Sequence, residues 1–135
     1  MTFDWKKYLK LAEFINSIDK QSENENIGDE AFYRCTVSRA YYSAFCYTRN
    51  YAISHLNYKR PTENRKENAH NHLINFLRDN AGTASIGSKL LRLKEWRKCC
   101  DYCDIIPSGV GNIKFLSAGA ILYANEIIKF VDEKS

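Results

Sequence analysis

The segment formed by residues 29–55 carries apolar side chains around most of a helical circumference. At about 100° of rotation per residue, these side chains form two stripes, which are Phe32, Cys35, Tyr42, Cys46 and Ile53, and Tyr33, Val37, Ala40, Ala44, Tyr47 and Tyr51. A helix that is apolar on so much of its surface is stable only when other elements surround it. The sequence therefore predicts a central helix over Asp29–His55.

Four further segments supply the surrounding helices. Apolar residues recur in them at steps of three and four, and the chain contains only 2 prolines and 6 glycines. We expect these helices over Phe3–Lys20, Thr62–Asp79, Ser85–Cys103 and Asn112–Asp132. Thr2 or Asp4 can cap the helix that starts near Phe3, and Thr62 can cap the helix that starts there. No segment shows the alternation of a half-buried strand. The predicted fold is all-α, an antiparallel four- to five-helix up-and-down bundle in a single domain over residues 1–135.

Composition limits where such a chain acts. No apolar run approaches the roughly 20 residues of a membrane span, and the first residues mix acidic and basic side chains. We therefore expect a cytoplasmic protein without membrane contact, whose 5 cysteines are reduced thiols. The formal net charge of +4 permits contact with RNA without requiring it.

Two arginines fall on the apolar faces of predicted helices. Arg39 lies between the two stripes of the central helix, and Arg97 projects into the apolar sector of the helix over residues 85–103. A buried guanidinium keeps its proton and needs polar or anionic partners. Asp101 lies four residues after Arg97, so it stacks beside Arg97 on the helix. Either Asp101 orients Arg97 toward a phosphate, or the two form an ordinary ion pair at the edge of the core.

Tyrosines surround both arginines in the sequence. In one interpretation Arg39 and Arg97 converge on one anion, with Tyr41, Tyr42 or Tyr102 as a hydroxyl donor or stacking surface. In the other, Arg39 pairs with an acidic residue of a neighbouring helix and the tyrosines fill the core. The spacing alone leaves both open.

The helix that holds Arg97 carries further positive charge, from Lys89, Arg92, Lys94 and Lys98. Such a run forms either a solvated face or part of a nucleic-acid groove. We count Lys98, from this run, as a candidate ligand-binding residue.

Histidine and cysteine offer weaker signals. His70 lies on an apolar helix face and either forms a hydrogen bond in the core or moves protons near the arginines. His72 points elsewhere, so the two histidines cannot easily share a metal ion. The Cys99-Cys100-x-x-Cys103 cluster has no second close pair to complete a zinc site. We expect neither a metal nor a cofactor.

Three segments in order resemble small prokaryotic HEPN-domain proteins. Residues 38–45 read SRAYYSAF, similar to the family's RAYYAAF motif, and residues 90–102 read LLRLKEWRKCCDY, similar to its L…LR…R..ADY segment. Between them, residues 69–76, AHNHLINF, match the place of a histidine at a helix start. The resemblance covers Phe3 to Phe130. It implies a bundle of four to five helices, commonly a homodimer, that binds RNA or a nucleotide. It also implies a defence or toxin–antitoxin setting with a minimal nucleotidyltransferase partner.

Ribonucleases of the wider superfamily carry an arginine followed, after four to six residues, by a histidine. In the four-residue form Tyr102 occupies the histidine position after Arg97, so the general base expected there is absent. The string Arg65–His70 fits the bare pattern but lies at the start of a different helix. His70 could still reach the site in space.

Three hypotheses follow. In the first, the domain binds RNA or a nucleotide phosphate through Arg39 and Arg97, supplemented by Asp101 and Tyr102. In the second, it is an endoribonuclease in which Arg97 stabilises the phosphorane charge and His70 moves protons. In the third, it is a non-catalytic dimerisation or scaffolding module in which both arginines are structural.

Overall fold

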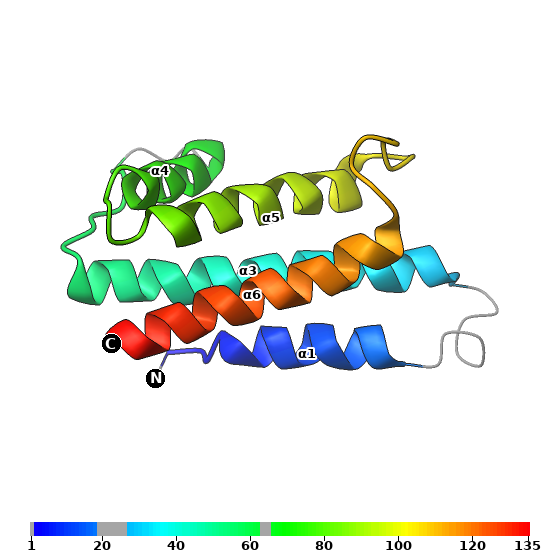
Figure 1. The fold of residues 1–135 in the computed structure, drawn as a ribbon, viewed down its shortest axis with the longest axis horizontal. Helices are drawn as coiled ribbons and strands as arrows, with labels where there is room; N and C mark the ends of the chain where they lie inside the picture. The colour runs from blue at the N-terminus through cyan, green and yellow to red at the C-terminus, as the bar shows by residue number, and fades with distance from the viewer. Residues whose placement is uncertain (1, 19–26, 63–65) are drawn as a thin grey trace.

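Four helices alternate in direction, and a fifth lies across them near one end (Figure 1). The computed structural model describes residues 2–18, 27–62 and 66–135. The helices are α1 (Lys6–Ser17), α3 (Asp29–His55), α4 (Lys66–Arg78), α5 (Ala84–Tyr102) and α6 (Ile113–Lys134). Helix α4 is the one that crosses the others. The predicted all-α bundle is confirmed.

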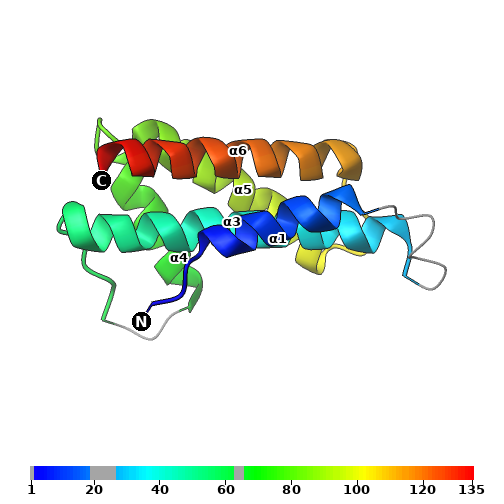
Figure 2. The same cartoon turned by 90° about the horizontal axis from the view of Figure 1, so that it is seen from below.

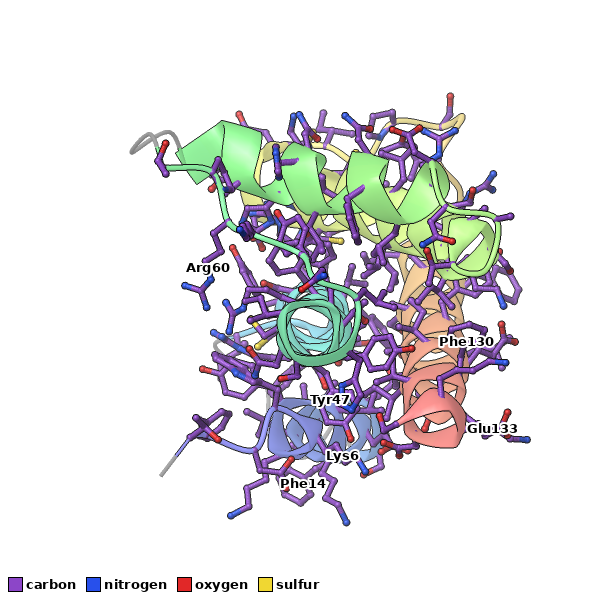
Figure 3. All side chains as sticks on the ribbon, turned by 90° about the vertical axis from the view of Figure 1, so that its left-hand side faces the viewer. Lys6, Phe14, Tyr47, Arg60, Phe130 and Glu133 are labelled. Atoms are coloured by element: carbon purple, nitrogen blue, oxygen red, sulfur yellow. The ribbon has the colours of Figure 1, made fainter. Side chains whose placement is uncertain are left out.

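Helix α3 forms the centre of the bundle. A view along its axis shows α1 on one side, α6 on a second and the α4–α5 pair on a third (Figure 3). Its bounds are the predicted ones. It follows Gly28, whose φ of 86° suits glycine. At its other end Asn57 adopts a φ of 57°, and the N–H of Tyr58 bonds back to the carbonyl of Ala52 at 3.1 Å.

The core is built around α3. Side chains from all five helices bury their apolar surface in one cluster. Its members in α3, α5 and α6 include Val37, Ala40, Tyr41, Ala44, Leu90, Leu93, Leu116, Ala120, Ala124 and Ile127. Seen from below, α6 runs along α3, while α5 passes behind them at an angle (Figure 2). The burial of α3 on several sides explains why its sequence is apolar nearly all round.

The helix ends follow local capping. The Asp4 carboxylate accepts a hydrogen bond from the N–H of Lys6 at 3.1 Å, so α1 begins at Lys6 rather than at Phe3. The N-cap position is occupied by Trp5, not by Thr2 or Asp4, and the N–H of Lys6 donates to Asp4, one residue before the cap. The Asn112 side chain caps α6 by accepting from the N–H of Lys114 at 2.8 Å. The predicted end of the first helix at Lys20 lies outside the described residues, as do residues 63–65, which follow the predicted cap Thr62.

No helix in the described ranges is long and apolar enough to cross a bilayer. All five cysteines carry free thiols, and two of them, Cys46 and Cys100, belong to the core cluster. They pack there as small apolar side chains.

Candidate functional site

A cavity of about 700 Å³ opens where α4 and α5 meet the middle of α3. Its lining consists of Tyr42, His70, Asn71, Lys94, Arg97, Lys98 and Tyr102. Three of these residues are permanent or near-permanent cations, and none is an acid. A cavity of this size is within the range of small-molecule sites. Its lining favours an anionic ligand.

Arg97 is the most buried of the three cations, with 8% of its surface exposed. Its Nη1 lies 3.4 Å from Oδ2 of Asp101, and Ser38 of α3 donates to that same oxygen, also at 3.4 Å. These bonds are long for charge-assisted contacts. Arg97 Nε has no hydrogen-bond partner among the residues that the structure describes. This nitrogen is buried, so Arg97 carries an unsatisfied donor inside the protein.

Aromatic rings replace the missing hydrogen bonds around Arg97. The guanidinium carbon lies 5.4 Å from the ring centre of Tyr41, 5.3 Å from that of Tyr42 and 5.9 Å from that of Tyr102. Ring faces attract a cation without consuming its N–H donors. The tyrosines thus hold the charge in place where Arg97 lines the cavity.

His70 of α4 reaches the same cavity from the opposite side. Its Nδ1 lies 2.6 Å from the hydroxyl of Tyr41, and its ring stacks on Phe45 with centres 4.3 Å apart. Burial, which is the largest cause, and the charges of Arg97, Lys94 and Arg49 together lower the pKa of His70 to about 4. His70 is therefore neutral at physiological pH.

The contact with Tyr41 determines which ring nitrogen of His70 carries the proton. A phenol is the stronger donor and an imidazole nitrogen the stronger acceptor of this pair. Burial also raises the pKa of Tyr41 far above its usual range, so its hydroxyl keeps its proton. With Tyr41 donating to Nδ1, the ring proton lies on Nε2, which makes Nε2 a neutral N–H donor.

Lysines complete the positive lining. Lys94 of α5 donates to the side-chain oxygen of Asn71 of α4, which joins the two helices across the cavity. Lys98 is exposed at the rim. Tyr102, at the end of α5, is 74% exposed, so its ring forms an accessible wall.

Arg39 takes a different place from the predicted one. Its guanidinium carbon lies 5.4 Å from the ring centre of Tyr8, which belongs to α1. Arg39 does not line the cavity that Arg97 lines. The expected convergence of the two arginines is therefore not observed, because α1 packs on this side of α3 and its tyrosine ring covers Arg39.

The other candidates come together as a group. Arg97, Tyr42, Lys98, Tyr102 and His70 line the cavity. Tyr41, which is fully buried, lies beneath it, and Asp101 touches Arg97 from the side.

The sequence placed Lys94 only in a charged run that could form a nucleic-acid groove, and it did not assign Asn71 or Ser38 to the site. A signal existed for Lys94, which precedes Arg97 by three residues and so shares its helix face. Asn71 and Ser38 gave no such signal, since their roles depend on contacts between helices.

His72 does not line the cavity. Its Nδ1 lies 2.8 Å from the hydroxyl of Tyr58. Within the described ranges, no group of three His, Cys, Asp or Glu side chains could hold a metal ion.

Comparison with protein-family models finds no matching family, and no curated protein or solved structure matches the chain.

Proposed function

We propose that this protein binds a phosphate group of RNA or of a nucleotide in the cavity between α3, α4 and α5. The observation that carries the proposal is Arg97, a largely buried guanidinium that lines a cavity with three cations and no acid. Arginine presents N–H donors in a planar fork that matches phosphate oxygens. The resemblance to HEPN-domain proteins also implies that the ligand is RNA or a nucleotide.

The remaining lining supports a nucleotide rather than a bare anion. The exposed ring of Tyr102 and the half-buried ring of Tyr42 offer faces on which a base can stack. His70 supplies an N–H donor that stays neutral, so it adds no charge of its own. Lys94 and Lys98 add two cations beside Arg97.

An endoribonuclease is the second candidate, because His70 lines the same cavity as Arg97. The hydrogen bond from Tyr41 to Nδ1 weakens this candidate. It engages Nδ1 and leaves the ring proton on Nε2, whereas a general base needs a free ring nitrogen. Binding without cleavage is therefore the better-supported function.

The test measures binding and cleavage in one sample. A fluorescent single-stranded oligoribonucleotide is titrated with protein in the presence of EDTA, with AMP as competitor, and RNA length is read at the end. We expect saturable binding and intact RNA. Arg97→Met should weaken binding by more than about tenfold, or about 1.4 kcal/mol.

The matched control is Arg92→Met, because Arg92 is exposed on the same helix outside the cavity. It changes net charge equally and should bind as the wild type does. Equal binding by both variants would remove Arg97 from the site, and absence of any binding would favour the scaffolding hypothesis. Shortened RNA, lost in both Arg97→Met and His70→Ala, would favour the endoribonuclease.

The resemblance extends the proposal to partners and setting. We propose a homodimer that acts in the cytoplasm in a defence or toxin–antitoxin system beside a minimal nucleotidyltransferase. Light scattering of the purified protein tests the dimer, and the identity of the neighbouring gene tests the nucleotidyltransferase.

A further inference from the structure

Arg34 of α3 makes the densest set of polar contacts among the described residues. Its Nη1 donates to the carbonyls of Cys100 at 3.0 Å and Cys103 at 2.6 Å, and its Nη2 to that of Asp104 at 3.3 Å. Its Nε donates to Glu30, one turn earlier on α3, at 2.9 Å. Glu30 thereby fixes the guanidinium in one orientation.

These carbonyls lie where α5 ends. The last carbonyls of a helix have no partner within the helix, and the helix dipole makes this end negative. The guanidinium of Arg34 donates to these unpaired carbonyls and also places a positive charge at the negative end of the helix. Its side chain is only 18% exposed, and its donors are directed at the protein. Arg34 therefore holds α5 to α3 and is not itself available to a ligand.

The end of α5 that Arg34 holds is the part that builds the cavity. Arg97, Lys98 and Tyr102 all lie within its last two turns. A second polar contact between α3 and this segment, from Ser38 to Asp101, is long at 3.4 Å. The contacts of Arg34 with Cys100 and Cys103 are shorter, so they fix this end of α5 more firmly.

A regular spacing on α3 connects Arg34 to the site. Arg34, Ser38 and Tyr41 follow one another at steps of four and three, so they lie on one face of the helix. Arg34 binds the end of α5, Ser38 contacts Asp101, and Tyr41 lies under Arg97 and bonds His70. This face of α3 therefore contacts the residues that build the cavity and positions them.

We infer that Arg34 is a positioning residue for the anion site: by clamping the end of α5 to α3 it sets where Arg97 and Tyr102 stand relative to His70. The inference rests on the proposed function for its effect on affinity, and on geometry alone for its effect on His70.

The test uses Arg34→Lys, which keeps the positive charge at the end of α5 but cannot donate to three carbonyls in a fork. Arg92→Lys is the control, since Arg92 is exposed on α5 and does not line the cavity. Three quantities are measured for both: thermal stability, affinity for the single-stranded oligoribonucleotide, and the pKa of His70 by NMR of the histidine rings. His70→Gln assigns the signal.

We expect Arg34→Lys to weaken RNA binding roughly tenfold, the size of effect known for residues that orient ligand-binding groups in metal sites. The pKa of His70 should rise from about 4 toward its ordinary value, because Arg97 moves away and the cavity opens. Arg92→Lys should change neither quantity.

A lower stability with unchanged affinity and unchanged His70 pKa would overturn the inference and leave Arg34 a purely structural residue. If the wild type binds no RNA, the proposed function fails, but the His70 measurement still decides the role of Arg34. An unchanged His70 pKa would then refute the clamp.

Discussion

Within the cavity, Arg97 and His70 influence each other through charge. Arg97 is permanently positive and mostly buried, and it disfavours a second positive charge on His70. Tyr41 touches both residues, by its ring face to Arg97 and by its hydroxyl to His70. The three side chains therefore form one electrostatic unit in which His70 stays neutral while Arg97 carries the charge.

This unit makes stability depend on pH. The pKa of His70 is about 4 in the folded protein and 6.5 when unperturbed, so between these values the unfolded chain binds more protons. Stability therefore falls as pH drops from 6.5 toward 4, and this contribution is lost below 4. We expect urea unfolding to give a lower free energy at pH 5 than at pH 7.

His70→Gln checks the assignment of that pH dependence. Glutamine can still accept from Tyr41 but does not titrate. The variant should lose a measurable part of the difference between the two pH values. If it keeps the full difference, other groups cause the effect and His70 is not the acid-sensitive residue.

The sequence predicted the surroundings of Arg97 better than those of Arg39. Both fall on apolar helix faces, but Arg97 has Asp101 one turn away on its own helix, a contact that spacing alone supplies. The environment of Arg39 depends on which helix covers its side of α3, and that side faces Tyr8. Periodicity gives the face of a helix but not the identity of its neighbour.

Among the helices, α4 and α5 approach each other closely at Gly87. A β-carbon built there would lie 2.8 Å from Cγ and 3.0 Å from the backbone nitrogen of Arg78, at the end of α4. The absence of a side chain at Gly87 lets α4 lie against α5, and so lets His70 and Asn71 reach the cavity.

We expect Gly87→Ala to destabilise the fold by about 1–3 kcal/mol, because overpacking outweighs the better helix propensity of alanine. Gly119→Ala in α6 is the matched control. Its β-carbon would meet only the ring of Trp96, at an ordinary 3.4 Å, so it should gain up to about 1 kcal/mol from propensity. Urea unfolding measures both. A stabilising Gly87→Ala would show that α4 and α5 have room to separate.

The helices themselves were largely predictable from sequence, because apolar periodicity and capping are local. The central helix has its predicted bounds, and Asn112 caps α6 where the sequence placed the start of that helix. The start of α1 was predicted three residues early, since the bond from Lys6 to Asp4 decides it. The crossing of α4 and the clamp by Arg34 depend on packing between helices, which periodicity does not specify.

Over the whole molecule, positive charge exceeds negative charge by 4, but only three cations line the cavity. Other arginines, including Arg39, Arg49 and Arg60, lie elsewhere along or near α3, and Arg60 stands on the side of α3 that no helix covers in Figure 3. An RNA could therefore bind by the cavity alone or across a wider basic surface. The two cases differ in how many phosphates are neutralised.

Salt dependence separates these cases. If the cavity alone binds the single-stranded oligoribonucleotide, three cations neutralise up to three phosphates. At roughly 0.7 per phosphate for single strands, the logarithm of affinity should fall with the logarithm of salt concentration with a slope of about −2. Arg97→Met should make this slope shallower, and Arg92→Met should leave it unchanged. A slope of about −4 or steeper would mean that the arginines along α3 bind RNA as well. A slope near zero would contradict phosphate binding in the cavity, because binding would then release no counterions.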